Sequence, residues 1–129
     1  MQFKKLFNNK DLPKALIRWG IAIVFFYFGY SQITKPTDWA GLVPEFFTKF
    51  ISASDLVFYN GIFEVTFATL LILGIYTRII SFILAVHLAG ISINLGMAPS
   101  GVRDFGLTVT TFVIFLNGTD KYCLENMWR

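Results

Sequence analysis

The sequence predicts an all-α fold, an integral membrane four-helix bundle whose N- and C-termini are cytoplasmic. Three observations predict it: 55% of the 129 residues are hydrophobic and 18% are aromatic, four apolar stretches follow one another, and basic residues gather beside them. A soluble domain of this length cannot hide so much apolar surface in one small core. A soluble helical bundle is the alternative, but it would need a polar face on every helix, and the stretch 79–95 has none.

Each apolar stretch is close to the length that lipid requires. A helix rises about 1.5 Å per residue and the hydrocarbon core is about 30 Å thick, so a span takes roughly 20 residues. Within a single transmembrane domain over 1–129, the stretches predict spans at about 15–34, 55–76, 79–96 and 104–122. The first span is expected to extend past Arg18, whose side chain would snorkel to the surface, and the fourth to include Tyr122 near the interface.

The basic residues predict the orientation. With the N-terminus inside, the cytoplasmic set holds eight of the 11: Lys4, Lys5, Lys10, Lys14, Arg18, Arg78, Lys121 and Arg129. The outer set holds three: Lys35, Lys49 and Arg103. The positive-inside rule therefore favours cytoplasmic ends, in a multi-pass protein of the inner (cytoplasmic) membrane. Because the charges flank the spans and do not share a solvated face, the net charge of +3 does not indicate a nucleic-acid partner.

The connections between the spans have different characters. The outer loop 35–54 is rich in aromatic residues and predicts a short interfacial helix at about 44–51. Gly74 to Arg78 predict a tight inner turn, so that the second and third spans form an antiparallel hairpin. The segment 96–104 predicts a plain outer turn. The one cysteine, Cys123, excludes an intramolecular disulfide and a cysteine-rich metal site.

Glu64 is the leading candidate for function, because a carboxylate inside a span is costly and should face the bundle with a partner or a proton. Counting residues from the ends of the spans places Glu64 and His87 at nearly the same depth, and Asn60 and Asn94 together nearer the outer edge. Gly90 would let the two helices approach closely. Glu64 and His87 could exchange a proton, as quinone chemistry or a proton relay requires, or could form one structural hydrogen bond.

Other residues have weaker claims. Tyr27, Tyr30 and Gln32 could close a small polar pocket that opens outward, although aromatic belt residues explain the tyrosines equally well. Arg18 and Arg78 flank the inner ends of spans and are interpreted as structural or topological anchors. No metal site is expected, since one His and one Glu fall short of the three or four ligands usual for zinc.

Three motifs carry a family resemblance: Gly-Tyr-Ser-Gln-Ile-Thr-Lys-Pro at 29–36, Gly-Ile-Phe-Glu at 61–64 and Leu-Gly-Ile-Tyr-Thr-Arg at 73–78. With them the chain resembles the DoxX-like family over 18–125. The resemblance implies a four-helix inner-membrane protein, in a family that includes subunits of thiosulfate:quinone oxidoreductase and maturation factors for periplasmic redox enzymes. It covers Glu64 and Arg78, but Gln32 stands where the family often has Lys, and Cys123 stands in a Ser position.

Three functions are compatible with this sequence. The first is a membrane subunit of a redox system, which has no covalent cofactor but meets a quinone near Glu64 and His87 while other membrane or periplasmic subunits supply electrons. The sequence has no haem motif, flavin fingerprint or cysteine cluster, so no redox centre of its own is expected. The second is a non-catalytic scaffold subunit. The third is a small-solute carrier or channel, which with four helices would need a homo-oligomer in the lipid bilayer.

Overall fold

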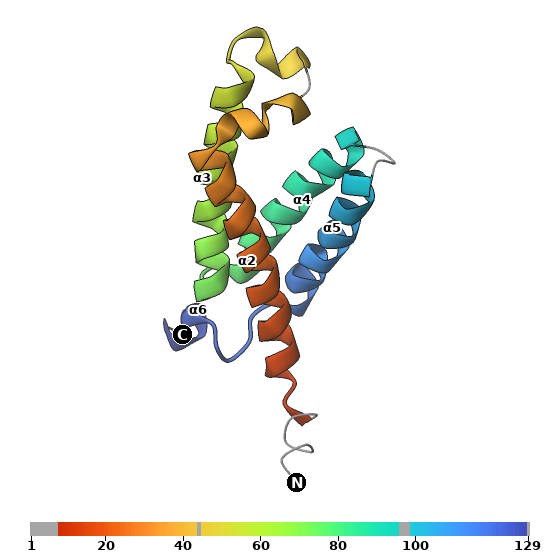
Figure 1. The fold of residues 1–129 in the computed structure, drawn as a ribbon. Helices are drawn as coiled ribbons and strands as arrows, with labels where there is room; N and C mark the ends of the chain where they lie inside the picture. Colours follow the sequence, from red (N-terminus) through yellow and green to blue (C-terminus); the bar gives the residue numbers. More distant parts are fainter. Residues whose placement is uncertain (1–7, 44, 96–98, 129) are drawn as a thin grey trace.

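The computed structural model describes residues 8–43, 45–95 and 99–128 and is all-helical within them (Figure 1). The four main helices are α2 (Asp11–Thr34), α3 (Ala53–Leu73), α4 (Thr77–Leu95) and α5 (Pro99–Asn117). Three short 3₁₀ helices, η1 (Pro36–Asp38), η2 (Ala40–Leu42) and η3 (Glu45–Lys49), connect α2 to α3, and a short helix α6 (Leu124–Trp128) follows α5. The predicted all-α fold with four main helices is confirmed.

The four helices form two antiparallel pairs, since α2 packs mainly against α3 and α4 packs mainly against α5 (Figure 1). We call the end of the bundle that holds η1, η2 and η3 the loop end, and the end that holds the α3–α4 connection the turn end. The two pairs meet in a core of buried apolar side chains. Its members are Ile21, Ala22, Phe25, Ala68, Leu71, Ile80, Leu84, Leu88 and Ile114.

The outer surface of the bundle is apolar. Large side chains that are more than one third exposed come from all four main helices, among them Ile23 on α2, Ile62 on α3, Val86 on α4 and Phe105 on α5. A soluble helical bundle places polar residues on such faces. The surface therefore has the composition that contact with lipid requires.

The α2–α3 pair is held at a close crossing of two glycines. A Cβ atom added at Gly61 would lie 2.7 Å from the carbonyl oxygen of Gly29, and one added at Gly29 would lie 2.9 Å from that of Gly61. The expectation that Gly90 provides the close approach is wrong, because a Cβ atom there would have no neighbour within 4 Å. Small residues let helix backbones meet, and here they join α2 to α3.

The connection between α3 and α4 is the tight turn that the sequence predicts. Gly74 ends α3 in the left-handed conformation (φ 77°), and its N–H donates to the carbonyl of Leu70 (2.9 Å). α4 then begins at Thr77, so α3 and α4 are consecutive antiparallel helices. They are not a tightly packed hairpin, however, because α3 packs mainly on α2 and α4 packs mainly on α5.

The fourth span differs from its predicted position. It was expected over about 104–122, whereas α5 runs from Pro99 to Asn117 and ends before Gly118 (φ 72°). Pro99 is the first residue of α5, a position where a proline has no hydrogen bond to lose. The predicted turn at 96–104 is therefore shorter: residues 96–98 lie outside the described part, and helix follows at once.

The C-terminal segment folds back over the turn end of the bundle. Cys123 lies against Gly74, where an added Cβ would come within 2.6 Å of it. Glu125 accepts a hydrogen bond from the backbone N–H of Thr77 (2.9 Å), which caps the start of α4. Tyr122 packs its ring on Trp19 (5.7 Å between centroids). This segment closes the turn end and does not extend the fourth span.

Arg18 is a buried structural residue and does not snorkel to the surface. Its side chain is 1% exposed and forms an ion pair with Asp120 (Nε to Oδ2, 3.1 Å). Its Nη1 also donates to the carbonyls of Leu71 (2.7 Å) and Ile72 (2.6 Å) at the end of α3. The sequence expectation failed because it gave Arg18 no partner. Arg78, by contrast, is exposed, and its guanidinium lies against Gly118.

The outer loop contains three 3₁₀ helices, of which η3 lies within the range 44–51 where a short helix was expected, whereas η1 and η2 were not expected. Residue 44 lies outside the described part, and η3 covers Glu45–Lys49. Trp39 anchors the loop to α2, because its Nε1 donates to Ser31 Oγ (3.0 Å) and its ring packs edge-on against Phe28 (5.5 Å). The loop is thus fastened over the end of the α2–α3 pair.

Candidate functional site

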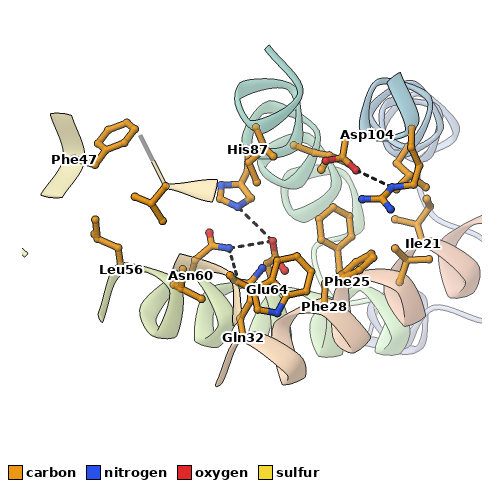
Figure 2. Close-up of a pocket in the computed structure, with 18 residues that line it drawn as sticks. Ile21, Phe25, Phe28, Gln32, Phe47, Leu56, Asn60, Glu64, His87 and Asp104 are labelled. Atoms are coloured by element: carbon orange, nitrogen blue, oxygen red, sulfur yellow. Dashed lines mark hydrogen bonds and ion pairs between the residues drawn. The ribbon is translucent and has the colours of Figure 1, made fainter. Parts of the chain in front are cut away.

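A cavity of about 530 Å³ opens in the loop-end half of the bundle, between the α2–α3 pair and the α4–α5 pair (Figure 2). Its walls are largely apolar and aromatic. These walls comprise Ile21, Val24, Phe25, Phe28, Trp39, Val43, Phe47, Leu56, Val57, Leu88, Ile91 and Leu107. A volume of this size lies within the range of about 300–1,000 Å³ that is usual for small-molecule sites.

Four polar side chains that the sequence singled out meet in this cavity: Gln32 from α2, Asn60 and Glu64 from α3, and His87 from α4. Asn60 Nδ2 donates to Gln32 Oε1 (2.8 Å) and to Glu64 Oε1 (3.2 Å). His87 Nε2 lies 3.6 Å from the same Glu64 oxygen. The predicted equal depth of Glu64 and His87 is thereby confirmed.

The local structure explains how these groups meet. Asn60 and Glu64 are four residues apart on α3 and so share one face of the helix. Gly61, between them in sequence, brings α2 close enough for Gln32 to reach Asn60. The His87 ring packs against Phe63 (4.8 Å between centroids), which fixes its approach from α4.

The Glu64–His87 pair retains unused hydrogen-bonding capacity. The Glu64 side chain is 5% exposed and the His87 side chain 26%. Glu64 Oε2 and His87 Nε2 are both buried, and neither has a hydrogen-bond partner among the described residues. Unpaired buried polar atoms cost free energy, so their presence at a cavity wall indicates a place where a ligand group can bind.

A second polar pair, Arg103 and Asp104 on α5, lines the same cavity. Asp104 is 7% exposed, and its Oδ1 lies 3.4 Å from Arg103 Nε. The Arg103 guanidinium lies over the ring of Phe28 (5.6 Å to the centroid). The sequence pattern predicts a turn at Arg103, and only the charge of this residue entered the prediction of orientation. A helix start at Pro99 is the signal that could have revealed the pair. It places Asp104 in the second turn of α5, on the face that it shares with Thr108 and Thr111.

Some expected site residues do not belong to the cavity. Tyr27 and Tyr30 are 68% and 60% exposed, so the polar pocket that was expected to join them to Gln32 does not form. They lie on the opposite face of α2 from the buried Phe25, Gly29 and Gln32. The side chain of Asn94 lies outside the described residues, so its pairing with Asn60 stays a prediction.

Metal ligation finds no support in the described part of the chain. There, no three His, Cys, Asp or Glu side chains come together as a set that could hold an ion.

Two helices, Asp11–Thr34 and Ala53–Leu73, are long and apolar enough to cross a membrane, and Thr77–Ile91 is a shorter apolar stretch.

Comparison with known proteins identifies a family for this bundle. The family model described as DoxX matches residues 14–97, which include α3, α4 and all but the first three residues of α2, with Gln32, Glu64 and His87. The resemblance expected for 98–125 lies beyond this match. A search of the curated proteins and a search of the solved structures found no significant match. Since the family model covers well over half of the chain, this protein belongs to the DoxX family of membrane proteins.

Proposed function

We propose that this DoxX-family protein is a small subunit of a redox system in the inner membrane, and that it binds a quinone in the cavity between its two helix pairs. The observation that carries this proposal is the Glu64–His87 pair at the wall of a largely apolar cavity, in which Glu64 Oε2 is buried without a partner and His87 Nε2 has only the 3.6 Å contact with Glu64 Oε1. A ring with polar edges and an apolar tail matches such a lining.

The chain's own groups suit proton exchange. A bound quinone supplies two-electron chemistry in which two protons add to its two oxygens. Glu64 can accept or release a proton at Oε2, which is buried without a hydrogen-bond partner, and it can share that proton with His87, whose Nε2 lies 3.6 Å from Glu64 Oε1. Asn60 donates to Glu64 Oε1 and holds the carboxyl group in place for either task. The second proton would come from water.

The electrons would come from a partner subunit that carries a redox centre. The sequence contains one Cys and one His, and no motif for haem or flavin binding. The apolar surface of the bundle faces lipid and leaves both ends for contact with partner subunits. The proposed role is therefore to hold a quinone and exchange its protons within a larger complex.

Glu64→Gln and Glu64→Ala separate proton exchange from structure. Gln keeps the size and the hydrogen bond to Asn60 but cannot exchange a proton, whereas Ala also removes the interhelical contact with His87, of a kind worth about 0.6–2 kcal/mol in membranes. We expect Glu64→Gln to retain wild-type thermal stability and to abolish turnover of the purified complex. Glu64→Ala should lower the thermal stability and also abolish turnover. Asp55→Asn, which changes an exposed carboxylate on the same helix, is the matched control.

Binding to the isolated protein in lipid nanodiscs provides the direct measurement. A short-chain quinone should quench Trp39, which lies in the cavity wall, in a Trp19→Phe, Trp128→Phe background. If no quinone binds and a stable complex with partners is recovered, the scaffold function replaces this proposal. Full turnover of Glu64→Gln would remove the proton-exchange role.

A further inference from the structure

We infer that Arg103, positioned by Asp104 and Phe28, is a second ligand contact, so that the cavity selects a neutral ring with oxygen functions on two opposite edges. This inference rests on the proposed function and deepens it. It assigns a role to the two charged residues of α5 that line the cavity.

The guanidinium of Arg103 is held at the cavity wall although its side chain is 56% exposed. Asp104 engages Nε at 3.4 Å, and the ring of Phe28 lies 5.6 Å beneath the guanidinium carbon. The Asp104 carboxylate that positions Arg103 is itself buried, since the Asp104 side chain is 10% exposed. Within the described part of the chain the Nη1 and Nη2 groups of Arg103 have no hydrogen-bond partner.

An arginine only donates hydrogen bonds, so Arg103 requires an acceptor on the ligand. The Glu64–His87 pair differs, because it can donate or accept as its proton moves. The Glu64–His87 pair joins α3 to α4, whereas Arg103 and Asp104 come from α5 and the Arg103 guanidinium lies over Phe28 of α2. A ligand between the pairs would thus meet proton-exchanging groups at one edge and a fixed donor at another.

The charges of the lining favour a neutral ligand. Arg103 is balanced by Asp104, and Glu64 is balanced by His87 when the two share a proton. Because each charged group of the lining already has its counter-charge, a ligand with a net charge would be left unbalanced in an apolar surrounding, where unbalanced charge is costly. A 1,4-quinone has two carbonyl oxygens on opposite edges of a neutral ring, whereas a monoketone can use only one of the two contacts.

The test compares two probes of nearly equal shape, menadione with two ring carbonyls and 1-tetralone with one, against wild type and Arg103→Met in nanodiscs. Menadione should bind Arg103→Met about tenfold or more weakly than wild type, as expected for the loss of a hydrogen bond to a charged group. Tetralone should change by less than about twofold, because its one carbonyl can turn to Glu64 and His87. Lys35→Met, which removes an exposed cation at the same end outside the cavity, should leave both affinities unchanged.

Two further variants guard against a folding defect. Arg103→Lys keeps the charge, and Asp104→Asn keeps the size of the positioning group while releasing Arg103, so each should weaken menadione binding but leave tetralone binding intact. Equal menadione affinity in wild type and Arg103→Met would overturn the inference and leave quinone binding standing. Absence of menadione binding to wild type would overturn the proposed function and, with it, this inference.

Discussion

The glycine crossing of α2 and α3 gives the sharpest structural prediction, and Gly61→Ala tests it. The new Cβ would lie 2.7 Å from the Gly29 carbonyl oxygen and 3.0 Å from Gln32 Cβ. Ordinary contacts begin at about 3.4 Å, so the two backbones must part by about 0.7 Å. The obstacle at Gly29 is backbone and cannot rotate away, which makes the separation unavoidable.

The separation acts directly on the site. The Asn60–Gln32 hydrogen bond is 2.8 Å long, and a shift of about 0.7 Å along it would stretch it to about 3.5 Å, beyond useful strength. Overpacking costs about 1–3 kcal/mol, and an interhelical hydrogen bond in a membrane is worth about 0.6–2 kcal/mol. The better helix propensity of alanine returns about 1 kcal/mol. We therefore expect a net loss of about 1–4 kcal/mol.

The assay is reversible unfolding in mixed micelles, with Gly20→Ala and Gly106→Ala as matched controls. Neither control residue would have any neighbour within 4 Å of an added Cβ, so both variants should be as stable as wild type or slightly more stable. Gly29→Ala should resemble Gly61→Ala, since its Cβ would lie 2.8 Å from Val65 Cγ2. If Gly61→Ala proves as stable as Gly20→Ala, the close crossing does not exist as described.

Two further predictions concern the turn end and the orientation. Arg18→Met should destabilise the bundle by about 3–5 kcal/mol in the same unfolding assay, because it leaves Asp120 buried at 2% exposure without its cation; a wild-type midpoint would show that the ion pair contributes nothing. A reporter fused after Arg129 should be cytoplasmic and one inserted at 35–54 periplasmic, as the distribution of basic residues predicts. The opposite labelling would refute that orientation.

The meeting of Glu64 and His87 could be predicted because it depends only on local regularities. A helix has a constant rise, so counting nine residues from Asp55 to Glu64 and nine from Arg78 to His87 gives the depth of each side chain. An error of a residue or two at each end still leaves the two side chains within one helical turn. The pairing thus depends only on α3, α4 and the turn that connects them, which are consecutive in the sequence.

Contacts between distant parts of the chain could not be predicted in this way. Arg18 and Asp120 are 102 residues apart, and no periodicity relates them. The apolar pattern predicts a fourth span that reaches Tyr122, whereas the left-handed Gly118 ends α5 and turns the chain back toward Arg18. The charge of Arg18 alone suggested a surface anchor, but its environment depends on Asp120, which lies near the other end of the chain.

The second polar pair of the cavity, Arg103 and Asp104, was not predicted either. Arg103 and Asp104 look like loop residues when the preceding Pro99 is taken as part of a turn. Once Pro99 begins a helix, Asp104 lies on the inward face and Arg103 reaches across to Phe28 of α2. A shift of a few residues in one helix start therefore moves Arg103 from a predicted turn to the wall of the cavity.

The positions of the polar groups and of the cavity have a common structural cause. At the turn end, Arg18 ties α2 to the end of α3 and to Asp120, and the apolar core fills the space between the pairs. At the loop end, the contacts that cross between the pairs include Glu64 with His87 and Arg103 with Phe28. Both crossings bring a polar group to the cavity. A ligand that occupies it would thus contact the same groups that link the two pairs, and its binding would hold together the end of the bundle that the core leaves open.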